Sequence, residues 1–102
     1  MPKFKFDLPA PIDSATAYTK IKNMLNGDND FKKFDPKVSC TFDEPKKKCS
    51  VNGSQFNATL QVSEKDSSSS EIAIEVEVPF ALALFKGKIQ EILEKNLNRI
   101  LT

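Results

Sequence analysis

The stretch from Phe56 to Val78, FNATLQVSEKDSSSSEIAIEVEV, decides the fold of this chain. It contains two runs in which every second side chain is apolar, and a polar segment, Lys65–Ser70, separates them. Strict alternation is the period of a β-strand with one buried face. The inward-facing residues of the two runs are Phe56, Ala58, Leu60, Val62 and Ile72, Ile74, Val76, Val78. The stretch therefore predicts two adjacent strands joined by a polar loop, and its four serines favour a flexible turn over a phosphorylation site.

Three shorter alternations upstream predict three more strands. Their inward-facing residues are Phe4, Phe6, Leu8; Val38, Cys40, Phe42; and Cys49, Val51. Pro9 and Pro11 are expected to end the first of these strands, because proline cannot donate to a ladder hydrogen bond. Between the later strands, Glu44–Lys46 has the chemistry of a turn, and Asn52-Gly53 is typical of a tight hairpin.

The outward-facing charges predict the order of the strands. The first strand presents Lys3 and Lys5, and the last presents Glu75 and Glu77. Opposite charges across an antiparallel pair stabilise it, so these two strands are expected side by side. With hairpins joining the other strands in sequence, the predicted sheet order is 1-5-4-3-2. The first helix must then cross the sheet to reach its far edge.

Helical periodicity first appears between the first two strands. A helix is predicted from a cap at Asp13 or Ser14, whose side-chain oxygen can accept from first-turn amides, to a stop at Gly27. Its inward face consists of Ala15, Tyr18, Ile21 and Leu25. Two aromatic residues are expected to pin the following polar connection, Asp28–Lys37, to the core: Phe31 and Phe34.

The closing helix has an uninterrupted apolar stripe, with polar residues on the opposite side. The stripe consists of Ile89, Ile92, Leu93, Leu97, Ile100 and Leu101. Leu93 and Leu97 are expected near the centre of the core, facing the middle strands. The predicted fold is an α+β domain, β-α-β-β-β-β-α, in which two helices pack on one face of a curved antiparallel sheet.

Length and composition predict one ordinary globular domain over residues 1–102. The chain has 15 Lys and Arg against 14 Asp and Glu, a net charge of +1, which argues against a dedicated nucleic-acid binder. No apolar run approaches the ~18 residues of a membrane span, and the amino terminus has no signal-peptide apolar region. We therefore expect a cytoplasmic protein in which Cys40 and Cys49 remain thiols.

The sequence offers little catalytic chemistry, since it has no histidine, the usual proton carrier near neutral pH. Cys40 and Cys49 fall on inward strand positions, so we interpret them as small core residues rather than as a redox pair. Two cysteines without a histidine are too few ligands for a zinc site. Lys46–Lys48 is interpreted as an exposed turn rather than a phosphate or nucleic-acid contact. Three carboxylates share a solvated strand face instead of a cleft: Glu71, Glu75 and Glu77. No catalytic residue, cofactor site or metal ligand is predicted, and we expect a protein that is not an enzyme.

The segment Pro79–Lys88 begins with seven residues that lack a polar side chain. One interpretation is a core-filling turn that leads into a helix beginning as early as Ala81. The other is an exposed apolar surface. The core-filling turn is favoured for most of these side chains. Lys86 and Lys88 would oppose the helix dipole if they lay in the first turn of the helix. A bound anion would relieve this conflict, and a helix that begins at Ala81, the favoured interpretation, would remove it. The candidate interaction surface, named the lip, consists of Phe80, Leu82, Leu84, Phe85, Lys86 and Lys88.

The segment after the last strand also carries a family resemblance. Pro79-Phe80, the run Phe85–Ile89 and the amphipathic terminal helix resemble the small bacterial polyhydroxyalkanoic acid system family. The opening Met1–Phe4 and the strand end Leu60–Val62 fit the same pattern, so the resemblance covers almost the whole chain. Members often have a tryptophan in the second-strand region, where this chain has Phe42 and no tryptophan at all.

The resemblance implies a non-enzymatic accessory protein of the polyhydroxyalkanoate storage system. Its partners would be the granule surface or the proteins that coat it, and no catalytic residues come with the family. The predicted layout is also similar to a reduced helix-grip domain, an architecture whose larger members bind hydrophobic ligands between sheet and helix. The alternative hypothesis is therefore a small hydrophobic-ligand-binding domain. Its cavity would be lined by residues such as Phe56, Leu60, Ile74 and Ile92.

Overall fold

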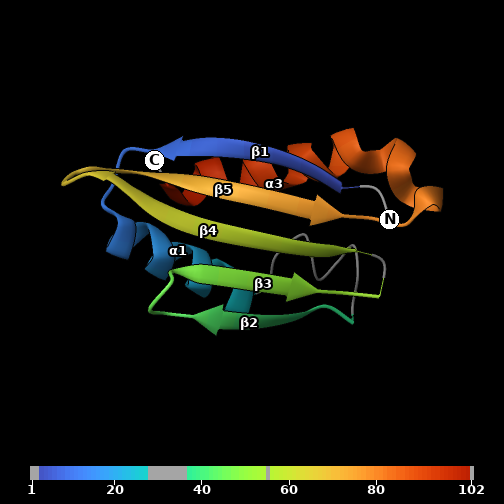
Figure 1. Ribbon diagram of the computed structural model, residues 1–102, viewed down its shortest axis with the longest axis horizontal. Coiled ribbons are helices and arrows are strands. Elements are labelled where there is room, and N and C mark those ends of the chain that lie inside the picture. Colours follow the sequence, from blue (N-terminus) through green and yellow to red (C-terminus); the bar gives the residue numbers. More distant parts are fainter. Residues whose placement is uncertain (1–2, 28–36, 55, 102) are drawn as a thin grey trace.

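The computed structural model describes residues 3–27, 37–54 and 56–101 (Figure 1). Its elements in chain order are β1 Lys3–Ala10, α1 Ser14–Asn26, β2 Ser39–Asp43, β3 Lys48–Asn52, β4 Asn57–Asp66, β5 Ser69–Glu77, the 3-10 helix η1 Phe80–Phe85 and α3 Lys86–Leu101. The predicted succession of strand, helix, four strands and helix is confirmed. The predicted contacts of Phe31 and Phe34 lie outside the described residues.

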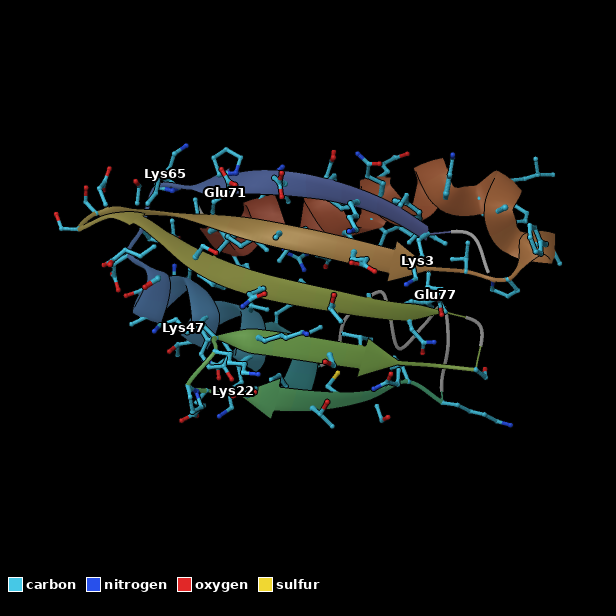
Figure 2. All side chains as sticks on the ribbon, viewed as in Figure 1. Lys3, Lys22, Lys47, Lys65, Glu71 and Glu77 are labelled. Atoms are coloured by element: carbon cyan, nitrogen blue, oxygen red, sulfur yellow. The ribbon has the colours of Figure 1, made fainter. Side chains whose placement is uncertain are left out.

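The five strands form one antiparallel sheet in the predicted order, β1-β5-β4-β3-β2. Lys3 lies opposite Glu77, and Lys5 lies opposite Glu75. Lys3 Nζ is 3.6 Å from a Glu75 oxygen and 3.7 Å from a Glu77 oxygen, and Lys5 Nζ is 3.6 Å from the other Glu75 oxygen. Figure 2 shows Lys3 and Glu77 together on the outer face of the sheet. These exposed pairs add little stability, but they favour the observed register.

Both helices lie on one face of the sheet (Figure 1). The predicted inward residues of β4 and β5, with the flanking Phe56 and Val78, are all buried, at 5% exposure or less. α1 contacts β2, β3, β4 and β5, whereas α3 lies behind β1 and β5 and contacts α1. Leu93 and Leu97 are buried in the core as predicted, but α3 lies nearer to the β1 edge of the sheet than to its middle (Figure 1). α3 follows β5 after a short connection, so it returns along the edge of the sheet beside that strand.

The first strand extends further than predicted, because β1 continues through Pro9 to Ala10. Pro9 pairs with Glu71 of β5, and β1 is an edge strand. On an edge strand, every second backbone N–H faces away from the sheet, so a proline there costs no ladder hydrogen bond. The prediction that Pro9 helps to end the strand overlooked this exception.

The predicted loop Lys65–Ser70 is mostly strand. β4 continues to Asp66, and β5 begins at Ser69, so only two residues form the turn. Ser70 is buried, and its hydroxyl donates to the Ile12 carbonyl at 2.9 Å. Backbone pairing therefore continues beyond the residues that show apolar alternation. Ser70, which was predicted to lie in a flexible turn, is held by its hydrogen bond to Ile12.

The hairpin between β3 and β4 is confirmed, but the tight turn at Asn52-Gly53 is wrong. Asn52 pairs with Asn57, so the four residues 53–56 connect the strands. Gly53 donates its N–H to the Phe56 carbonyl at 2.9 Å, and its φ is not in the left-handed region that a two-residue turn of this type requires. The longer loop places Phe56 in the core at 3% exposure.

α1 begins at the predicted cap. The Asp13 carboxylate accepts from the Thr16 hydroxyl at 2.7 Å and from the Thr16 N–H at 3.0 Å, which together hold the pKa of Asp13 below its ordinary value. The helix ends before Gly27, as predicted. Its buried side includes Ala17 in place of the predicted Ala15, which is exposed. Both alanines fit the helical spacing, so only the direction from which the sheet packs decides between them.

α3 turns its predicted stripe toward the core. Four members are buried and the other two are half-buried: Ile89, Leu93, Leu97, Leu101 and Ile92, Ile100. Asn96 is also buried, which the apolar pattern did not predict. Its amide nitrogen donates to the Ile92 carbonyl at 2.8 Å, and its oxygen accepts from Arg99 at 2.9 Å. These bonds explain how a polar side chain is tolerated on the inner face.

Candidate functional site

The lip is exposed. Its first four residues lie in η1, and α3 continues directly from η1 at the right-hand end of the molecule (Figure 1). The exposed fraction is 80% for Phe80, 93% for Leu84 and 52% for Phe85. The favoured interpretation of a core-filling turn is therefore wrong for these three side chains. The side chain of Leu82 lies outside the described part of the structure.

Two buried residues hold the lip in place. Val78 before it is 0% exposed, and Ile89 after it is 4% exposed. Between them the chain winds with ~3 residues per turn, so the side chains of η1 point to different sides of its axis. They cannot all reach the core, and the apolar excess of this segment is left facing solvent.

Lys86 and Lys88 are exposed next to the apolar side chains of the lip. Helical conformation begins at Phe80, one residue before the earlier start predicted at Ala81, although the α-helix proper begins at Lys86. The Lys86 N–H donates to the Ala83 carbonyl in the 3-10 helix. Because this amide already has an acceptor, the two lysines do not require a bound anion.

The predicted lining of an internal cavity faces the helices. Phe56, Leu60 and Ile74 are buried at 3%, 0% and 1% exposure, and Ile92 is half-buried against the core cluster to which they belong. The surface hollows of about 170, 480 and 230 Å³ lie elsewhere, on the outer face of the sheet. They are lined mainly by polar residues such as Lys3, Glu75 and Thr59. None of these three hollows lies between the sheet and the helices, where the buried apolar side chains of the described residues form one cluster.

Tyr18 on α1 is a buried residue whose hydroxyl has no hydrogen-bond partner. Its side chain is 6% exposed, and burial, followed by the neighbouring Cys49, raises the pKa of its hydroxyl. Sequence reasoning placed Tyr18 on the inner face of the helix but could not foresee the orphaned hydroxyl. A buried polar atom without a partner costs free energy, so the Tyr18 hydroxyl is expected to destabilise the fold.

Replacing Tyr18 with phenylalanine is expected to raise the free energy of unfolding by about 1–2 kcal/mol, because the substitution removes an unsatisfied buried hydroxyl and keeps the ring. Urea unfolding of the wild type and Tyr18→Phe measures the difference. Thr41→Val, at an exposed position on β2, is the control for loss of a hydroxyl on the surface. A destabilised Tyr18→Phe variant would show that the hydroxyl has a partner, such as a buried water.

The two cysteines are not joined by a disulfide. Cys40 lies opposite Val51, and Cys49 lies opposite Phe42, so the thiols are diagonal rather than directly across the ladder. Burial raises the pKa of Cys49 to about 12, with a smaller contribution from Cys40. A thiol with this pKa is not a nucleophile near neutral pH, so the core interpretation is favoured.

Two further ion pairs lie on the surface. Lys65 pairs with Glu71 at 3.9 Å, and Lys22 pairs with Glu44 at 2.8 Å while lying over the Phe42 ring. The expected exposed turn at Lys46–Lys48 is confirmed only in part, because the turn ends at Lys47, Lys48 begins β3, and both of these lysines are half-buried. Among the residues that the structure describes, no group of three or more potential ligands could hold a metal ion.

Comparison with known proteins identifies the architecture only. No protein-family model and no curated protein matches the chain. Among solved structures, the di-domain aromatase/cyclase BexL from the BE-7585A biosynthetic pathway is similar with a TM-score of 0.74 and 9% identity, over 99% of this chain and 45% of BexL. A START superfamily protein from Mycobacterium smegmatis gives a TM-score of 0.62 and 10% identity, with 96% of each chain covered. The Zhui aromatase/cyclase from Streptomyces sp. R1128 gives 0.63 and 6%, over 98% of this chain and 91% of Zhui.

These similarities show that the chain has a helix-grip fold of the START and aromatase/cyclase type. The chain spans less than half of BexL. At such low identities the fold does not transfer an activity. The proteins of similar fold include aromatase/cyclases, so the absence of enzymatic activity stays a prediction. None of the comparisons concerns polyhydroxyalkanoate, and that resemblance also stays a prediction. No helix in the described ranges is long and apolar enough to cross a membrane.

Proposed function

We propose that this domain binds a small hydrophobic molecule between the sheet and its two helices, and that the lip is the point of entry. The observation that carries the proposal is the exposure of Phe80, Leu84 and Phe85 where η1 leads into α3. Three large apolar side chains in water are unfavourable by about 1.5–3 kcal/mol each relative to full burial. A hydrophobic ligand that covers them recovers part of this free energy.

The position of the lip supports an entrance. β5 ends at Glu77, and the buried Val78 leads directly into the exposed Phe80. Ile89, one turn into α3, is buried again. The apolar surface of the lip is therefore connected in sequence to the packed interior at both ends. A ligand at the lip can reach this interior if α3 shifts at its start.

The interior supplies the matching chemistry. Leu60 and Ile74 face each other across the β4–β5 ladder and are buried beneath the helices. They and the half-buried Ile92 belong to one apolar cluster. Among the described residues, the Tyr18 hydroxyl is the one buried side-chain polar group without a hydrogen-bond partner. A mainly hydrocarbon ligand with one hydrogen-bond acceptor fits this environment best.

A titration with the neutral fluorescent probe N-phenyl-1-naphthylamine tests the proposal. Saturable fluorescence enhancement is expected, together with NMR shifts of the Leu60, Ile74 and Leu93 amides. The lip variant Phe85→Ser plus Leu84→Ser is expected to bind several-fold more weakly, whereas Ala81→Ser at a neighbouring exposed site should bind as the wild type does. Shifts confined to residues 80–88, or no saturable binding, would overturn internal binding.

A second candidate function is association with polyhydroxyalkanoate granules, as the family resemblance implies. The specific observation in its favour is the 93% exposure of Leu84 beside the 80% exposure of Phe80, which presents an apolar edge to any aliphatic surface. Co-sedimentation with polyester granules tests this role. The Phe80→Asp plus Leu84→Asp variant is expected to remain in solution. Equal sedimentation of that folded variant and the wild type would contradict granule binding through the lip.

A further inference from the structure

We infer that the lip docks onto an anionic phospholipid bilayer. This inference deepens the proposed function, because the membrane would supply the hydrophobic ligand at the point of entry. The lip combines exposed apolar side chains with exposed lysines in one short helical segment at one end of the molecule (Figure 1). That combination is typical of surfaces that lie in the interface of a negatively charged membrane.

The apolar part of the lip is suited to shallow insertion. Phe80, Leu84 and Phe85 are the large hydrophobic side chains that the described structure leaves exposed, and all three belong to η1. They are therefore concentrated in one short segment rather than scattered over the surface, and they project from different sides of its axis. A segment of six residues cannot span a bilayer. It can place its side chains among the headgroups and the first part of the acyl chains.

The charges within the lip segment have one sign. From Pro79 to Gln90 the sequence contains Lys86 and Lys88 and no acidic residue. Both lysines are exposed, and neither forms an ion pair with a described residue. Elsewhere on the sheet face, lysines such as Lys3 are paired with glutamates. The lip therefore carries two positive charges on a chain whose net charge is only +1, and the flanking acidic residues Glu77 and Glu91 lie outside it.

Charge complementarity is what favours a bilayer over other apolar partners. An uncharged polyester or an apolar protein surface would contact the phenylalanines but would leave both lysines without a partner. In a bilayer the anionic headgroups lie directly above the acyl chains. Apolar side chains that reach the acyl chains therefore bring the neighbouring lysines to the level of the headgroups. A bilayer satisfies both parts of the lip at once, and its attraction for the lysines decreases with salt.

Vesicle flotation measures this inference directly. The full chain is mixed with vesicles of phosphatidylcholine containing about 30% phosphatidylglycerol, with vesicles of phosphatidylcholine alone and with polyester particles. Binding to the anionic vesicles is expected, with much weaker binding to the neutral ones. Lys86→Gln plus Lys88→Gln is expected to reduce anionic binding about 30-fold at low salt. Phe80→Ser plus Leu84→Ser is expected to reduce it at least about tenfold.

A matched charge variant and a ligand titration complete the design. Lys20→Gln plus Lys46→Gln removes the same two charges at exposed sites away from the lip and is expected to float as the wild type does. Circular dichroism checks that every variant is folded. Equal loss in both lysine pairs, or equal binding to neutral vesicles or polyester, would overturn docking on anionic lipid. The wild type is also titrated with N-phenyl-1-naphthylamine in the absence of vesicles, so failure of membrane docking is distinguishable from failure of ligand binding.

Discussion

Replacing Leu97 with alanine is expected to lower the free energy of unfolding by about 2–5 kcal/mol, a large part of the ~5–15 kcal/mol typical of a small domain. Leu97 is 0% exposed on the inner side of α3, where it belongs to the apolar cluster shared with α1 and the sheet. The substitution removes most of a buried side chain and leaves a cavity that the packed surroundings cannot fill completely. Urea unfolding followed by circular dichroism measures the loss.

Glu91→Ala is the matched control for this experiment, because Glu91 is exposed on the same helix. Its substitution is expected to change the free energy of unfolding by no more than about 0.5 kcal/mol. Glu94 is less suitable, since it is half-buried and accepts a hydrogen bond from Gln90 at 2.9 Å. If Glu91→Ala proves as damaging as Leu97→Ala, the orientation of α3 described above is wrong.

Replacing Ile21 with alanine is expected to have a similarly large effect, a loss of about 2–5 kcal/mol. Ile21 is 0% exposed at the centre of the buried face of α1. This helix contacts β2, β3, β4 and β5, so it closes the half of the sheet that α3 does not cover. Removing the Ile21 side chain therefore opens the core beneath the middle strands. The same urea unfolding experiment gives its magnitude.

Lys20→Ala tests whether the Ile21 effect comes from packing or from the helix itself. Lys20 is exposed at the adjacent position, and both substitutions introduce alanine, which favours helix formation. We expect Lys20→Ala to be within about 0.5 kcal/mol of the wild type. A loss for Ile21→Ala no larger than that for Lys20→Ala would contradict the placement of α1 against the middle strands.

Most of the sheet could be predicted because its signals are local. The alternation around Leu60 and Ile74 specifies strands and their inner faces without reference to the rest of the molecule. The outward lysines of the first strand and the outward glutamates of the last then predicted a long-range pairing, because their charges are opposite. The strand ends at Pro9 and Ser69 were misplaced, because backbone pairing continues where side-chain alternation has already stopped.

The candidate site was predictable in part. The sequence located the lip at Pro79–Lys88, because seven residues without a polar side chain between a strand and a helix are unusual. Whether Phe80 and Leu84 are buried could not be predicted, since a run without alternation has no period from which an inner face can be assigned. The unpaired Tyr18 hydroxyl carries no sequence signal, because the aromatic ring fits the apolar face of the helix equally well with or without it.

The sequence alone determined the succession of elements, the inner faces of the strands and the order of the sheet, because periodicity and charge act between residues that are neighbours along a strand or across a ladder. Only the tertiary structure decided that Ala17 rather than Ala15 is buried, that α1 covers the middle strands and that the lip faces solvent. These features depend on the direction from which one element approaches another. That direction is set by the packing of the whole core, which no single segment encodes.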